Sequence, residues 1–94
     1  MRIGQDTAED LAASATIWLA GDPEIAGGFL SATGLAPEDL AQVAGDRGFL
    51  LAVLDYLLQR DDWVLAFARD QGIDPALPML ARQVLAGRAG MNWT

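Results

Sequence analysis

Hydrophobic residues recur at helical spacing along most of the chain. Near the beginning, Leu11, Ala15, Trp18 and Leu19 fall on one stripe, and polar residues such as Ser14 lie away from it. Residues three, four and seven positions apart share one face of an α-helix, so this spacing predicts an amphipathic helix. Between residues 49 and 58 the apolar positions cover about two thirds of a helical wheel, which predicts a helix at the centre of the fold.

Aspartate, proline and glycine divide this pattern into six helices. An aspartate side chain accepts backbone N–H groups at a helix start, proline fits the first helical position, and glycine adopts the left-handed backbone that ends a helix. The expected starts are Asp6 or Thr7, Asp22 with Pro23, Pro37, Asp46, Asp61 or Asp62, and Leu77, and the expected ends are Gly21, Gly34, Gly45 and Gly72.

A longer pattern repeats with a displacement of 38 residues. Phe29, Gly34, Leu35 and Pro37 recur as Phe67, Gly72, Ile73 and Pro75. The same displacement carries Trp18 onto Tyr56, Glu24 onto Asp62 and Ile25 onto Trp63. Self-similarity at a fixed period indicates repeated structural units, so the chain is interpreted as two copies of one three-helix unit.

The predicted fold is all-α: a compact six-helix bundle built from two tandem three-helix units offset by 38 residues. One domain is expected over residues 1–94, with unit one at about 6–45, unit two at about 46–86 and a tail at 87–94. A unit of this size buries too little apolar surface to fold alone, so the two copies are expected to pack together. Phe29 and Phe67 should then occupy equivalent places.

The absence of three residue types from the sequence limits the kinds of active site and metal site that the chain can form. The chain has no cysteine, histidine or lysine, so zinc ribbons, thiol nucleophiles, Ser-His-Asp triads, Schiff bases and Walker A loops each lack an essential residue. Aspartates at the expected helix starts are interpreted as caps. We therefore expect no enzyme activity, no metal and no cofactor, with an enzyme that uses carboxylates alone as the alternative.

The charge is negative and unevenly distributed. Thirteen acids and six arginines give a net charge of −7, and residues 1–46, with eight acids and one arginine, carry all of it. Phosphates are poorly attracted to such a chain, so no nucleic acid is expected as a partner. A weak helix-turn-helix regulator remains a further alternative, because Arg82 and Arg88 lie on or after the sixth helix.

The beginning of the sequence predicts neither secretion nor a membrane anchor. Asp6, Glu9 and Asp10 stand where a signal peptide would need apolar residues. The longest apolar run, residues 49–54, is far shorter than the roughly 20 residues that cross a bilayer. A cytoplasmic location is therefore expected.

The sequence resembles the family of short bacterial proteins known as domain of unknown function 3572. The resemblance covers residues 8–86 and depends on three strings of residues. They are Trp18-Leu19 with Asp22 and Phe29; Thr33-Gly34-Leu35 with Pro37, Asp39 and Leu40; and Val53 to Leu58 followed by Gly72-Ile73-Asp74-Pro75. It implies a helical bacterial protein and carries over no catalytic residues.

Four apolar residues stand where the helical pattern predicts exposed positions or no helix. Ile17, Leu65 and Met79 fall on faces expected to be wet, and Trp93 lies in the expected tail. Exposed apolar groups are typical of contact surfaces when they gather. We therefore predict a protein-interaction or regulatory module that contacts another protein or a second copy, through these residues, the acidic first unit, or both.

The second expected helix contains a glycine pair that the repeat does not share. Gly27 and Gly28 align with Leu65 and Ala66, and each helical glycine costs about 1 kcal/mol relative to alanine. The favoured interpretation is a tolerated pair at a tight helix crossing, and a movable helix is the alternative.

Overall fold

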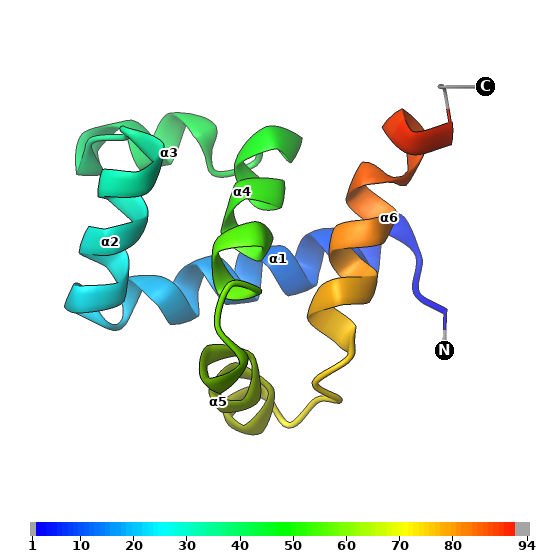
Figure 1. Cartoon of the computed structure of the whole chain (residues 1–94). Coiled ribbons are helices and arrows are strands. Elements are labelled where there is room, and N and C mark those ends of the chain that lie inside the picture. The colour runs from blue at the N-terminus through cyan, green and yellow to red at the C-terminus, as the bar shows by residue number, and fades with distance from the viewer. Residues whose placement is uncertain (1, 92–94) are drawn as a thin grey trace.

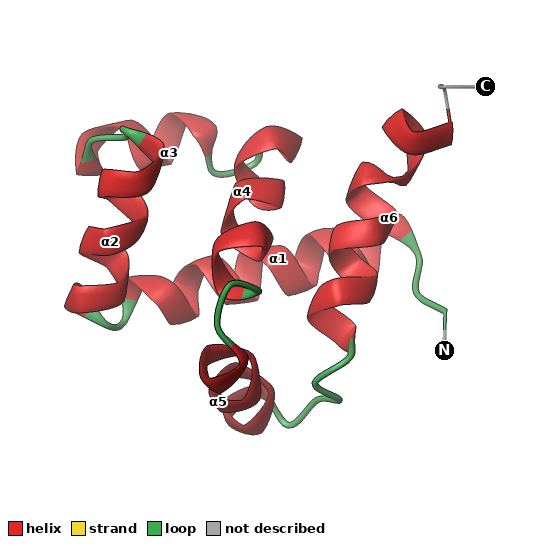
Figure 2. Cartoon of the chain, viewed as in Figure 1, coloured by secondary structure: helices red, strands yellow, loops and turns green. Residues whose placement is uncertain are grey.

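The part of the chain that the structure describes is built from helices. The computed structural model describes residues 2–91, with side chains as far as residue 87. In this range there is no strand, and the elements are α1 (Gln5–Ala20), α2 (Pro23–Thr33), the 3-10 helix η1 (Pro37–Asp39), α3 (Leu40–Val43), α4 (Arg47–Leu57), α5 (Asp61–Gln71) and α6 (Leu77–Met91) (Figure 2). The predicted all-α fold is confirmed.

Most helix boundaries follow the local signals in the sequence. The Asp22 side chain accepts hydrogen bonds from backbone N–H groups in the first turn of α2, and Asp46 does the same for α4. Two helices end at a glycine with a left-handed backbone, Gly34 at φ 76° and Gly72 at φ 68°. Only glycine adopts this conformation without strain, which explains why both helices stop there.

The start of α1 differs from the prediction. The helix begins at Gln5 after Gly4, which has no side chain to cap it, and Asp6 lies within the first turn. Capping by Asp6 or Thr7 is therefore wrong. Ile3 packs against the core and the Ala8 N–H donates to the Gly4 carbonyl, so the chain enters the helix earlier than a capping side chain would require. The Asp6 carboxylate still favours the positive end of the helix dipole.

The third helix of each half also departs from the expected pattern. The helix expected from Pro37 is a single 3-10 turn followed by the four residues of α3. In the second half, α6 begins at Leu77 as predicted, but its backbone stays helical to Met91. Residues 87–91 therefore continue a helix, and assigning them to a tail without helical structure is wrong. Glycine at 87 and 90 weakens a helix but does not end it where no cap or proline follows.

The core lies where α4 and α6 pack against α1, with α2 on the other side of α4 (Figure 1). α4 supplies five buried side chains, Phe49, Leu50, Val53, Leu54 and Leu57, which agrees with the central position predicted for this segment. α1 contributes Ala8, Ala12, Ala15 and Leu19, and Leu11 and Trp18 of the predicted stripe are only half-buried. The small alanines allow close approach of neighbouring helices.

Among the described residues, three aromatic contacts join the halves of the molecule, and two of them correspond to each other in the repeat. Phe29 packs edge-on against Tyr56 at 5.5 Å between ring centroids, and Phe67 packs edge-on against Trp18 at 5.8 Å. The 38-residue displacement exchanges these two pairs, since it carries Phe29 onto Phe67 and Trp18 onto Tyr56. The third helices, in contrast, differ in length and in packing. Duplication of the whole unit stays a prediction.

Candidate functional site

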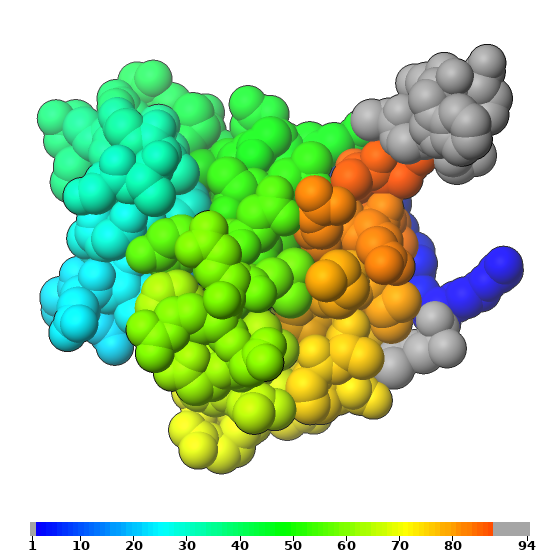
Figure 3. Space-filling model, viewed as in Figure 1, coloured from blue at the N-terminus to red at the C-terminus, as the bar shows by residue number. Residues whose placement is uncertain are grey.

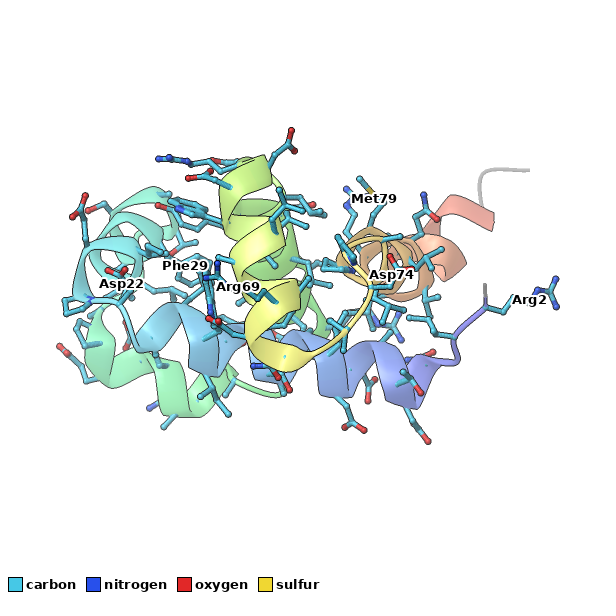
Figure 4. The ribbon with its side chains drawn as sticks, turned by 90° about the horizontal axis from the view of Figure 1, so that it is seen from below. Arg2, Asp22, Phe29, Arg69, Asp74 and Met79 are labelled. Carbon is cyan, nitrogen blue, oxygen red and sulfur yellow. The ribbon has the colours of Figure 1, made fainter. Side chains whose placement is uncertain are left out.

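The apolar residues singled out in the sequence lie on three separate helices. Ile17 on α1 is 75% exposed, Leu65 on α5 is 58% exposed and Met79 on α6 is 46% exposed. None of them belongs to the hydrophobic core, and Met79 projects from the side of α6 that faces away from α1 (Figure 4). Trp93 lies outside the described residues. Single exposed apolar side chains are common on soluble proteins, so these three do not define a site by themselves.

A cleft that combines aromatic and charged side chains opens between the beginnings of α2 and α5. It has a volume of about 420 Å³ and is lined by Asp22, Glu24, Ile25, Tyr56, Arg60 and Trp63. We call it the α2–α5 cleft. The space-filling view shows the two contributing segments side by side, α2 in cyan and the α4–α5 connection in yellow-green (Figure 3).

The α2 wall is fixed by the helix cap. The Asp22 Oδ1 atom accepts hydrogen bonds from the backbone N–H groups of Glu24, at 3.0 Å, and Ile25, at 3.3 Å. This cap holds the first turn of α2 in place, with Asp22 at the end of the molecule opposite Arg2 (Figure 4). Asp22 and Glu24 are exposed, and among the described side chains neither takes part in an ion pair. The wall is therefore acidic.

The floor of the cleft is a pair of aromatic rings. Tyr56 of α4 and Trp63 of α5 have centroids 5.2 Å apart with an interplanar angle of 35°. Tyr56 also packs edge-on against Phe29. A Cβ atom built on Gly28 would overlap the Tyr56 hydroxyl oxygen, whereas one built on Gly27 would meet nothing within 4 Å. Gly28 thus makes room for the tyrosine, and the predicted tight crossing applies to one glycine of the pair.

Arg60 covers part of this aromatic floor. Its guanidinium carbon lies 4.9 Å from the centroid of the Trp63 ring, a cation–π distance. The Nε and Nη2 atoms donate to the two carboxylate oxygens of Asp62, at 3.0 and 2.8 Å. The guanidinium is therefore held by two hydrogen bonds to Asp62 and by its contact with the face of the Trp63 ring.

The pair of Arg60 and Asp62 shifts both ionisation equilibria. The hydrogen bond and charge of Asp62 raise the pKa of Arg60 above its ordinary value, and the carboxylate of Glu24 adds to this. The hydrogen bond from Arg60 lowers the pKa of Asp62. The side chains are 56% and 63% exposed, so water screens the attraction between them and the pair contributes little to stability. The pair matters for the cleft because it sets where the guanidinium of Arg60 lies.

The α2–α5 cleft has the chemistry to hold an organic cation. Three carboxylates, those of Asp22, Glu24 and Asp62, lie in or beside it against the single guanidinium of Arg60. Aromatic faces attract cations through their quadrupole, and carboxylates nearby add charge attraction. The sequence interpretation gave Tyr56 and Trp63 places in the repeat but missed the cleft. One signal in the sequence pointed to this place. At the positions of Ile25 and Asp22 in unit one, unit two has Trp63 and Arg60, so the repeat changes residue type there.

The remaining surface offers less chemistry. A cavity of about 50 Å³ lies between α1, α2, α3 and α4, and its lining is apolar except for Thr16. Among the described residues, no three acidic side chains gather as a metal site would require. No helix in the described range has the length and apolar character needed to cross a membrane.

Comparison with known proteins identifies the family. The family model described as protein of unknown function (DUF3572) matches residues 5–88, which is most of the chain. No curated protein and no solved structure matches this chain. Because the match extends from α1 into α6, it includes both walls of the α2–α5 cleft. The chain therefore belongs to the DUF3572 family.

Proposed function

We propose that this protein is an interaction module that binds a basic segment of another protein. The observation that carries the proposal is the α2–α5 cleft, whose lining combines the aromatic rings of Tyr56 and Trp63 with the carboxylates of Asp22 and Glu24. A cationic side chain entering the cleft would meet ring faces and negative charge together. The net charge of −7 favours the approach of such a partner over longer distances.

The two alternatives considered from the sequence receive less support. An enzyme that uses carboxylates alone needs two acids in different environments at one cleft, and Asp22 and Glu24 are both exposed. A DNA reader needs free basic groups, but Arg82 pairs with Asp55 at 2.7 Å. We therefore propose neither catalysis nor nucleic-acid binding for this chain.

A peptide titration tests the proposal. The ¹⁵N-labelled protein is titrated with a short peptide in which arginine and lysine alternate with glycine, and the shifts of the backbone and indole N–H signals are mapped. We expect the largest shifts at residues that line the cleft. Shifts confined to Ile17, Leu65 and Met79, or no shifts at all, contradict the proposal.

A matched pair of variants makes the test specific to the cleft. Glu24→Gln and Glu38→Gln remove the same charge from exposed first-turn positions, but only Glu24 lines the cleft. We expect Glu24→Gln to weaken peptide binding by about 2- to 5-fold and Glu38→Gln to weaken it less, as exposed charge pairs contribute little each. Equal effects would mean that only the overall charge attracts the peptide.

A further inference from the structure

We propose that the α2–α5 cleft selects the guanidinium group of an arginine side chain, and that Arg60 is an internal stand-in which the partner's arginine displaces. This inference depends on the proposed function, because it names the group within a basic segment that the cleft recognises. It goes beyond that function by separating arginine from lysine and by assigning a role to a residue of the cleft itself.

The position of Arg60 shows which cation the cleft accommodates. Its guanidinium lies over the Trp63 ring and is forked by both oxygens of Asp62. A planar guanidinium can stack on an aromatic face and donate two parallel hydrogen bonds at once, whereas an ammonium is a point charge without a plane. The place that Arg60 occupies is therefore shaped for arginine and would hold lysine less well.

The stand-in is weakly held and leaves space beside it. Both members of the Arg60–Asp62 pair are more than half exposed, and an exposed ion pair of this kind is easily broken. The cleft keeps a volume of about 420 Å³ with Arg60 in place, and its other wall carries Asp22 and Glu24. An incoming guanidinium can thus enter beside Arg60, and Asp22 and Glu24 attract it before the exchange.

Local helix stability does not explain an arginine at this position. Arg60 is the residue before α5, and its side chain makes no capping hydrogen bond. The corresponding residue of the other half, Asp22, caps α2 with two such bonds. Arginine is a poor choice for an N-cap, where aspartate, asparagine or serine satisfies the free N–H groups. What Arg60 does contribute is the contact with Trp63 and Asp62.

The test of selectivity uses three matched peptides. Acetylated and amidated glycine tripeptides with arginine, lysine or citrulline at the centre are titrated against the full chain, and the Trp63 indole N–H signal is followed after assignment with Trp63→Phe. Citrulline keeps the shape of arginine without its charge. We expect arginine to bind most tightly, lysine less and citrulline least. Lysine binding as tightly as arginine overturns the inference but leaves the proposed function standing, whereas failure of both cations overturns both.

The test of displacement uses two arginine variants. Arg60→Ala and Arg69→Ala remove the same charge from exposed side chains at or on α5, but only Arg60 lies in the cleft. We expect Arg60→Ala to tighten binding of the arginine peptide by about 3- to 10-fold over Arg69→Ala, the range that a weak ion pair and one exposed cation–π contact allow. If Arg60→Ala tightens the lysine peptide equally, Arg60 only repels cations and the stand-in role is wrong.

Discussion

The corner between α1 and α2 and the corner between α4 and α5 use corresponding residues but end in different surfaces. At the first corner, Trp18 packs on Phe67 and its indole N–H donates to Asp70 Oδ2 at 2.8 Å. At the second corner, Tyr56 occupies the corresponding place and packs on Phe29, but it also faces Trp63. The first indole has a hydrogen-bond partner on the last turn of α5, whereas the second aromatic forms the floor of a cleft.

The helix caps differ in the same direction. Asp22 accepts hydrogen bonds from the first N–H groups of α2, whereas the Arg60 side chain accepts none from those of α5. A helix start without a cap is less stable by roughly 1 kcal/mol. The first corner is therefore built for local stability, whereas the second lacks a capping side chain before its helix and places a guanidinium over an aromatic ring.

Truncation of the two phenylalanines is expected to have the largest effect. Phe67 is fully buried, and Phe67→Ala should lower the free energy of unfolding by about 3 to 5 kcal/mol through lost burial and a residual cavity. Phe29 already lines the small cavity between α1, α2, α3 and α4, so Phe29→Ala should fall at the low end, about 3 kcal/mol. Urea unfolding measures both. A greater loss for Phe29→Ala would contradict the more open packing inferred for its surroundings.

The glycine pair of α2 gives the next largest effect. Gly28→Ala places a Cβ atom against the Tyr56 hydroxyl, so the ring must shift against Phe29 and Trp63 or α2 must move away from it. We expect the free energy of unfolding to fall by about 1 to 3 kcal/mol, as it does when an extra methyl group is forced into a packed position.

Gly27→Ala is the matched control, because its Cβ would meet nothing within 4 Å. Alanine is a better helix former than glycine, so we expect the free energy of unfolding to rise by about 0.5 to 1 kcal/mol. Thermal unfolding of the two variants side by side gives opposite signs if the contact with Tyr56 holds. A gain from both would show that the tyrosine moves aside freely.

Most helix boundaries could be predicted from the sequence because local chemistry sets them. Asp22 with Pro23 starts α2, and Gly34 and Gly72 end their helices, since capping and a left-handed backbone need only neighbouring residues. The exposure of Ile17 could also be predicted, because it follows from the place of this residue on the helical wheel. These features need no knowledge of the tertiary packing.

The cleft could not be predicted, because its parts meet only through tertiary packing. Nothing near Tyr56 in the sequence shows that its hydroxyl will lie against Gly28, and nothing near Trp63 shows that it will line the same cleft as Asp22. The start of α1 was missed for a related reason: packing of Ile3 on the core, rather than a cap, decides where that helix begins. Long-range contacts override local preference in both places.

The residues before α2 and α5 are expected to affect stability in opposite directions when they are replaced. Asp22→Ala removes the cap of α2 and should lower the free energy of unfolding by about 1 kcal/mol. Arg60→Asn gives α5 a side chain that can accept its first N–H groups, so it should raise the melting temperature even though the contacts with Asp62 and Trp63 are lost. Calorimetry on both variants measures the contrast. A lower melting temperature for Arg60→Asn would mean that the arginine stabilises its corner after all.

The smallest effect concerns protonation of Asp62. Its pKa is lowered by the hydrogen bond from Arg60, so the folded protein keeps this carboxylate charged at a pH where the unfolded chain has begun to protonate. The stabilisation is present above the ordinary carboxyl pKa of about 4 and is lost as the pH falls through the lowered value. Carboxyl ¹³C shifts should place the midpoint of Asp62 below the ordinary value, and Arg60→Gln should move it back up. An unchanged midpoint in Arg60→Gln would show that the fork is not kept in solution, and the second corner would then lose the fixed guanidinium that distinguishes it from the first.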